Sequence, residues 1–118
     1  MAGSVVITDD NVAEVLRELE TAKERGLAKI GLAAVGYTRE NTPVRRGVLR
    51  DAWASEVVPD EDAVYVGDLI SKYPEGEEPY GKYVENGSRN NKAVHMLRDA
   101  ATQHSDEYRK IMERELKG

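Results

Sequence analysis

A run of apolar residues at helical spacing constrains the fold of this chain most. From position 12 onward apolar side chains recur at intervals of three and four, with one lysine among them: Val12, Leu16, Leu19, Lys23, Leu27, Ile30, Ala34 and Tyr37. This spacing places side chains on one face of an α-helix. Asp9 and Asp10 supply helix-capping chemistry before it, and Thr42 is disfavoured in helical geometry because Pro43 follows. The pattern predicts one amphipathic helix that ends near residues 39–41.

Three glycines lie inside this predicted helix. Gly26, Gly31 and Gly36 each weaken a helix by about 1 kcal/mol relative to alanine. Either the helix breaks near Gly26, or the glycines let another backbone approach closely. The surrounding residues are mostly small, so we favour close packing on a sheet or on a neighbouring subunit.

The middle of the chain predicts a β-hairpin followed by a loop. Residues 49–58 read as a strand with Trp53 in the core, residues 59–62 as a turn, and residues 63–67 as the return strand. Pro74, Gly76 and clustered acids predict that 68–79 is a mobile loop. Tyr80 to Asn86 fits a short helix or strand, which Gly87 ends.

A second helical stripe predicts a C-terminal helix over about residues 93–116. Its apolar or aromatic positions again alternate by three and four: Val94, Leu97, Ala101, His104, Tyr108 and Ile111. A chain of 118 residues fits a single domain, here 1–118. We therefore predict an α+β fold, in which a long N-terminal helix and a C-terminal helix pack on a small antiparallel sheet.

The composition limits the core and the environment. The chain has no cysteine and no phenylalanine, so six tyrosines and Trp53 supply all its aromatic area. Their polar tips favour the edges of the core or contacts between subunits, which is consistent with self-association. The longest apolar stretch, residues 27–37, has eleven residues and includes Lys29. That is far short of the roughly 20 that span a bilayer, so we expect a soluble protein with no membrane contact.

Charge is unevenly distributed along the chain. Residues 59–91 carry eight acids against three bases, whereas the only local basic cluster is formed by three arginines nearby. An acidic segment argues against DNA binding that reads sequence. The acids could form a solvated loop, and the arginines could contact phosphate, but we favour ion pairing within or between subunits. The candidate interface consists of Arg45, Arg46, Arg50, Asp60, Glu61, Asp62, Glu75, Glu77 and Glu78.

The sequence carries no recognisable catalytic or metal-binding constellation. His95 and His104 lie on opposite faces of the predicted helix, so they cannot share one metal ion. Asp99 could orient His95, but no nucleophile is arranged with them. The acids of residues 75–78 do not show the spacing of ligands around a glycine that is typical of a calcium-binding loop. We expect no enzyme activity, no metal and no cofactor.

Three short blocks, in order, resemble a known family. The chain is similar to the tail-completion and head–tail joining proteins of long-tailed bacteriophages and prophages, over roughly residues 10–115. The residues that carry the resemblance are Pro43, Val44, Gly47, Leu49 and Arg50; then Tyr80, Tyr83, Val84, Glu85 and Gly87; then Leu97, Arg98 and Ala100. The chain departs from the family pattern at Arg45-Arg46, Asn86 and Asp99.

The resemblance implies a structural role in virion assembly. It implies a ring, commonly a hexamer, between the head connector and the tail tube, with a channel through which DNA passes without sequence-specific binding. It places the protein in the host cytoplasm during assembly and then at the virion neck or tail end. Rings need heterologous interfaces. The arginines could therefore meet the acidic segment of a neighbour, or the acids could line the channel. A small cytoplasmic regulatory module that binds proteins is the alternative, and a hydrolase using carboxylates is less favoured.

Overall fold

The computed structural model of the chain describes residues 12–43, 47–87 and 92–118. The helices are α1 (Val12–Asn41), α2 (Gly47–Ala52), α3 (Gly81–Asn86), α4 (Met96–Gln103) and α5 (Ser105–Lys117), and the strands are β1 (Trp53–Val58) and β2 (Ala63–Asp68). Two short 3₁₀ helices, η1 (Pro59–Glu61) and η2 (Ile70–Lys72), follow the strands. The predicted cap at Asp9 and Asp10 lies outside the described residues.

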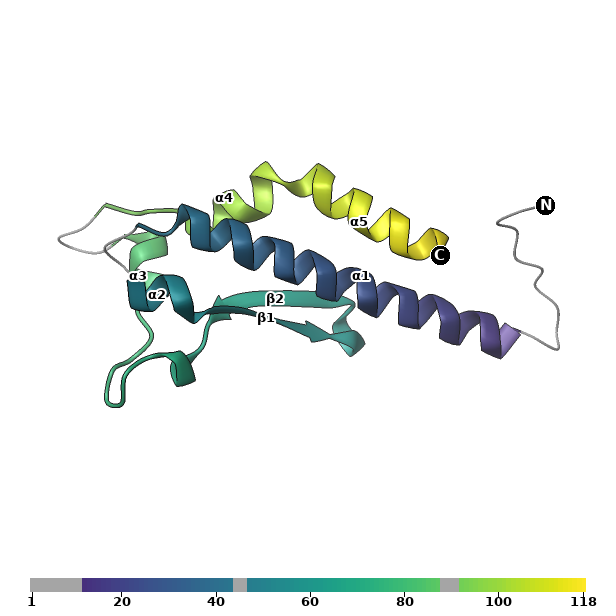
Figure 1. The fold of residues 1–118 in the computed structure, drawn as a ribbon, viewed down its shortest axis with the longest axis horizontal. Coiled ribbons are helices and arrows are strands. Elements are labelled where there is room, and N and C mark those ends of the chain that lie inside the picture. Colours follow the sequence, from purple (N-terminus) through teal and green to yellow (C-terminus); the bar gives the residue numbers. More distant parts are fainter. Residues whose placement is uncertain (1–11, 44–46, 88–91) are drawn as a thin grey trace.

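Helix α1 is the middle layer of the molecule. The two-stranded sheet lies along one side of it, and α4 and α5 lie along the other (Figure 1). The result is a flat, elongated body with extents of 61 × 29 × 19 Å. The predicted α+β class with its long N-terminal helix is confirmed, and the structure adds that α1 separates the C-terminal helices from the sheet.

The long helix is continuous and ends where the sequence predicts. After Asn41, the Thr42 amide donates to the carbonyl of Arg39 over 3.1 Å, and the Thr42 hydroxyl donates to the carbonyl of Thr38 over 2.7 Å. Pro43 then has no N–H with which to continue the helix.

Two of the three glycines in α1 are sites of close packing. A Cβ at Gly31 would lie 2.7 Å from Val64 Cγ2 and 2.8 Å from Ser55 Cβ, so the sheet approaches the helix backbone there. A Cβ at Gly26 would lie 2.6 Å from the sulfur of Met112 on α5. A Cβ at Gly36 would meet nothing within 4 Å. Close packing is confirmed at the first two, and contact of Gly36 with a neighbouring subunit stays a prediction.

The antiparallel hairpin is confirmed, but its first strand begins later than predicted. Trp53 pairs with Asp68, and Val58 pairs with Ala63. Residues 49–52, the start of the predicted strand, instead belong to α2, which begins at Gly47. Leu49 and Ala52 are both fully buried, and a spacing of three puts two side chains on one side of a helix but on opposite faces of a strand.

The predicted single C-terminal helix is wrong, because the chain bends between α4 and α5. His104 at the bend has φ −122° and ψ 18°. Its ring stacks on the ring of Tyr37, with centroids 3.4 Å apart and planes 1° from parallel. The Tyr37 hydroxyl also donates to Glu107 in the first turn of α5. These contacts hold the start of α5 against α1.

The hydrophobic core is concentrated near the C-terminal end of α1. Seven buried side chains contact one another there: Val35, Leu49, Ala52, Trp53, Tyr73, Val84 and Met96. Trp53 is confirmed as a core residue, and its indole Nε1–H donates to the Thr42 hydroxyl over 2.9 Å. By contrast, the N-terminal part of α1 extends beyond the sheet (Figure 1).

The glycine packing can be tested by a matched pair of substitutions. Gly31→Ala should lower the free energy of unfolding by about 1–2 kcal/mol, because overpacking against Val64 and Ser55 outweighs the gain in helix propensity. Gly36→Ala should raise it by about 0.5–1 kcal/mol, because that site is open. Urea denaturation of monomeric protein measures both. Equal effects of the two substitutions would contradict the proposed role of Gly31.

Candidate functional site

The three sequence blocks that carry the family resemblance meet at the end of the molecule that contains the hydrophobic core, here called the core end. Leu49 of the first block and Val84 of the second belong to the same buried cluster as Met96, which immediately precedes the third block. Leu97 packs against this cluster, and Ala100 is buried. The blocks therefore form one structural unit, although they are far apart along the chain.

Glu85 joins the second block to the third by capping α4. Its carboxylate accepts hydrogen bonds from the Leu97 amide over 2.8 Å and from the Arg98 amide over 3.0 Å. The side chain of His95, the N-cap residue, makes no capping bond. A carboxylate at this position satisfies free helix N–H groups and lies at the positive end of the helix dipole. Glu85 thus fixes where α4 begins.

Gly87 brings the chain back toward α4. Its φ of +81° lies in a region that side chains rarely adopt, and a Cβ there would lie 3.0 Å from the backbone nitrogen of Ala93. Nearby, the Val94 amide donates to the Val84 carbonyl over 2.8 Å. The glycine of the second block therefore permits the backbone conformation that lets Glu85 lie at the start of α4.

Asp68 organises the start of α3, a role that the sequence did not indicate. Its Oδ2 accepts from the Gly81 amide over 2.9 Å and from the Tyr73 hydroxyl over 2.6 Å. Burial, together with the bond to Asp68, raises the pKa of Tyr73. The ring of Tyr80 packs edge-on against the ring of Tyr73, with the ring centroids 5.2 Å apart. The predicted helix or strand over residues 80–86 is a helix, and Tyr73 anchors the loop before it. The mobility of that loop stays a prediction.

The other described block residues lie mostly at or near the surface. Arg50, Tyr83 and Arg98 are exposed, and Pro43 is half-buried at the end of α1. These four side chains are therefore not part of one enclosed site. Val44, Arg45 and Arg46 lie outside the described residues.

The candidate acidic interface divides into two separate groups. Asp60, Glu61 and Asp62 lie at the hairpin turn, where Asp62 pairs with Lys23 of α1. Arg50 lies in α2, at the other end of β1, and a six-residue strand spans about 20 Å. The hairpin acids therefore do not reach Arg50 within one subunit. No ion pair among the described residues joins Arg50 to Glu75, Glu77 or Glu78 either, so pairing between subunits stays a prediction.

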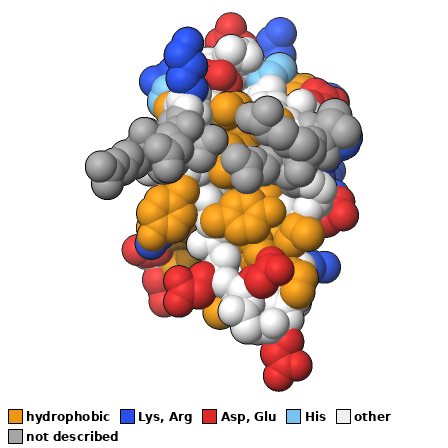
Figure 2. Space-filling view, turned by 90° about the vertical axis from the view of Figure 1, so that its left-hand side faces the viewer, with side chains coloured by type: hydrophobic (Ala, Val, Ile, Leu, Met, Phe, Trp, Pro, Cys, Tyr) orange, Lys and Arg blue, Asp and Glu red, His pale blue; other side chains and the backbone are white. Residues whose placement is uncertain are grey.

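The core end also exposes apolar side chains. Figure 2 views this end and shows hydrophobic side chains interspersed with acidic ones. Its exposed large hydrophobic residues, here called the end patch, come from α2, α3 and the region of η2: Val48, Leu69, Ile70 and Tyr83. Clustered exposed apolar side chains mark contact sites more often than scattered ones do.

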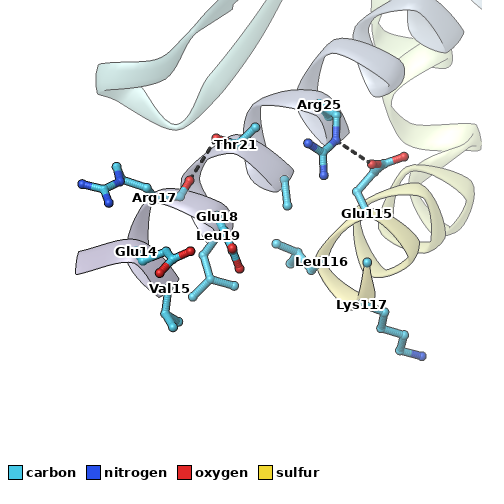
Figure 3. Close-up of a pocket in the computed structure, with 12 residues that line it drawn as sticks. Glu14, Val15, Arg17, Glu18, Leu19, Thr21, Arg25, Glu115, Leu116 and Lys117 are labelled. Atoms are coloured by element: carbon cyan, nitrogen blue, oxygen red, sulfur yellow. Dashed lines mark hydrogen bonds and ion pairs between the residues drawn. The ribbon is translucent and has the colours of Figure 1, made fainter. Parts of the chain in front are cut away.

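At the other end, a pocket of about 610 Å³ separates the N-terminal part of α1 from the C-terminal end of α5. Its lining mixes acidic, basic and apolar side chains, and Arg25 and Glu115 bridge the two helices at one side of it (Figure 3). Arg25 Nε lies 3.3 Å from Glu115 Oε2, and Lys29 also pairs with Glu115. The bonds from Lys29 and Arg25 lower the pKa of the Glu115 carboxyl.

Two further observations concern metal binding and membrane-spanning helices. Within residues 12–43, 47–87 and 92–118, no three His, Cys, Asp or Glu side chains are grouped so that they could hold a metal ion. None of the helices in this part of the chain is long and apolar enough to cross a membrane.

The capping role of Glu85 makes a specific prediction. Glu85→Ala should lower the free energy of unfolding by about 2 kcal/mol, because two partly buried N–H groups lose their charged acceptor. Glu85→Gln keeps one acceptor oxygen and should lose about half as much. Hydrogen exchange at the Leu97 and Arg98 amides should accelerate in both variants. Glu78→Ala, at an exposed position, is the control and should change stability little. Unchanged exchange in Glu85→Ala would refute the cap.

The Glu115 contact predicts a dependence on pH. A carboxyl whose pKa is lower in the folded chain than its ordinary 4.5 stabilises the fold above that value. The stabilisation disappears as the pH falls through the lowered pKa. The wild type should therefore have a modestly higher melting temperature than Glu115→Gln at pH 7, and the difference should vanish in strong acid. A difference that persists in strong acid would assign the effect to packing.

One of three comparisons with known proteins gave a match. Searches of the curated proteins and of the solved structures gave no significant match. The family model described as "Bacteriophage HK97-gp10, putative tail-component" matches residues 8–87, which is more than half of the chain. The match includes the first two blocks and ends at Gly87, beside the Glu85 cap. The chain belongs to the HK97-gp10-like family of bacteriophage tail components.

Proposed function

We propose that this tail component is a tail-completion subunit, which forms a ring at the end of the tail and joins it to the head connector. The observation that carries the proposal is the flat shape of the subunit together with apolar surface left uncovered on several sides. A ring subunit must meet a different face of its neighbour on each side. A subunit at a junction must also meet the structures above and below it.

The end patch is well suited to one of these contacts. Ile70 is 68% exposed, and Val48, Leu69 and Tyr83 are also exposed, on or next to short elements whose neighbouring residues belong to the core. Acids of residues 75–78 lie in the same part of the chain and are exposed. Apolar anchors with a charged rim are typical of protein–protein contacts. We assign this end to the head connector or the tail tube.

The acidic surface suits a channel that carries DNA. In the ring, acids facing the channel would repel the DNA phosphates, so that the duplex passes without being held. The hairpin acids Asp60 and Glu61 are exposed and belong to the surface that could face the channel. The role is structural, with no reaction and no cofactor. Assembly takes place in the host cytoplasm before the subunit enters the virion neck.

Assembly in solution tests this function. Light scattering with size-exclusion chromatography, over a range of concentrations, should show closed oligomers, which negative-stain microscopy should show as rings. The same measurement should be made in the presence of connector and tail-tube proteins from the same phage or prophage, because some rings form only on their partner. A monomer under all of these conditions would overturn the proposal.

A complementation experiment tests the role in the virion. A phage that lacks this gene should accumulate DNA-filled heads and unattached tails, and the wild-type protein should restore joined particles. Ile70→Glu should reduce joining, because it places a charge in the end patch. Glu113→Gln, at an exposed position on α5, is the matched control. Normal particle yield without the gene would contradict the proposed role.

A further inference from the structure

Helix α1 leaves two opposite sides uncovered. With 100° between successive residues, Gly31 faces the sheet, and Gly26 and Tyr37 face α5. These two contacts lie about 130° apart around the helix, so they leave a narrower sector of its surface on one side and a wider sector on the other. The other two sides of α1 therefore form the broad sides of the molecule, and Figure 1 looks onto one of them.

One broad side carries an apolar groove of about 350 Å³. Its floor and walls come from α1, β2 and the C-terminal helices: Ile30, Ala34, Val64, Val66, Leu97 and Tyr108. Ala101, which is exposed, lies at its edge. Residues at the same helical phase of α1, Leu16, Leu19 and Leu27, line a second apolar pocket nearer its N-terminus. The apolar stripe of α1 is thus only partly covered by its own fold.

The opposite broad side carries a ridge on the same helix. Ala28, Leu32 and Gly36 are exposed and four residues apart, so they form one line. Leu32 is 70% exposed, the highest value among the exposed large hydrophobic side chains of the described residues. It is about 180° around the helix from the middle of the groove. The predicted apolar stripe does not include it, so packing within the subunit does not explain it.

We propose that the ridge of one copy packs into the groove of the next copy, so that this contact repeats around the ring. The inference rests on the proposed function and names the surfaces that form the ring. A ring contact of this kind requires two different faces on each subunit. Helix α1 provides both, at about the same position along its length. A broad side of 61 × 29 Å projects roughly 1,800 Å², about twice the ~800 Å² per partner of a standard stable interface.

The local chemistry suits this contact. Gly36 and Ala28 keep the ridge low beside Leu32, so another backbone can approach closely. Two charged neighbours of the ridge, Arg25 and Lys29, already pair with Glu115. Docking over these two residues therefore buries no unpaired cation, which would oppose association. The exposed acids Glu24 and Glu40 continue the line of the ridge at its two ends. Leu32 supplies an apolar anchor of the size that a small apolar groove accepts.

Two charge substitutions, one on each face, test the contact. Leu32→Glu and Ala101→Glu should each weaken self-association by roughly tenfold or more, because each buries an unpaired carboxylate in the contact. Circular dichroism should show normal folding, since both positions are exposed. Tyr65→Glu is the control, because Tyr65 is exposed on β2, outside the ridge and the groove, and its substitution should leave self-association unchanged.

Mixing the two variants tests the polarity of the contact. Leu32→Glu keeps an intact groove and Ala101→Glu keeps an intact ridge, so a mixture should form one-to-one dimers that do not grow. The chain has no natural cysteine, which permits a cross-linking test. The double variant Leu32→Cys/Ala101→Cys should oxidise to a ladder of oligomers, whereas Leu32→Cys alone should not cross-link.

The outcomes separate this contact from the proposed function. If the wild type assembles but both glutamate variants assemble equally well, the contact is wrong and the ring remains. If Ala101→Glu abolishes binding to the connector or the tail tube while self-association persists, the groove belongs to that other protein. If the wild type stays monomeric even with those partners, the ring fails and this contact fails with it.

Discussion

The packing of two layers against opposite sides of one helix determines the rest of this structure. Gly31 lets the sheet approach α1, and Gly26 lets α5 approach it from the other side. Both contacts depend on the absence of a side chain, so they hold these layers closer than any larger residue would allow. The molecule is therefore only about one secondary-structure element thick along its shortest dimension, which measures 19 Å. A single helix cannot cover its own remaining sides, and the other elements of the described chain cover them only in part.

Polar contacts compensate for a small core. The buried polar side chains Thr38, Thr42 and Glu85 each have a hydrogen-bond partner. Thr42 accepts from Trp53 and also closes the end of α1, so the largest core side chain and the end of the longest helix share one hydroxyl. Buried polar groups that are fully paired favour a single arrangement of the chain. These bonds help to fix the orientation of the sheet and of α4.

Much of this fold could be predicted from the sequence, because long periodic patterns report burial directly. The course of α1, the hairpin and the core position of Trp53 follow from spacing and turn chemistry. The bend at His104 was missed because the apolar stripe continues across it without a change of period. The acids that follow, Asp106 and Glu107, are a helix-start signal that could have revealed it.

The short elements and the polar contacts were less accessible. Helix α2 has only six residues, too few for a period to be distinguished from that of a strand. The single useful sign was the pair Leu49 and Ala52 at a spacing of three. The role of Asp68 depends on Gly81, thirteen residues away, and no local pattern records such a pair. Glu85 was identified through the family resemblance, but its task as the cap of α4 required the geometry.

The buried and exposed block residues have different physical roles. Leu49, Val84, Glu85 and Ala100 are buried and fix how the segments of the chain meet, whereas Arg50, Tyr83 and Arg98 are exposed. The sequence blocks do not include Leu32 of the ridge, most residues of the groove or Ile70 of the end patch. Buried contacts tolerate little change because each must match its neighbours. An exposed surface needs to match only its partner, so this fold could be retained while its partners differ. The departures at Asn86 and Asp99, an exposed and a half-buried position, are consistent with that division.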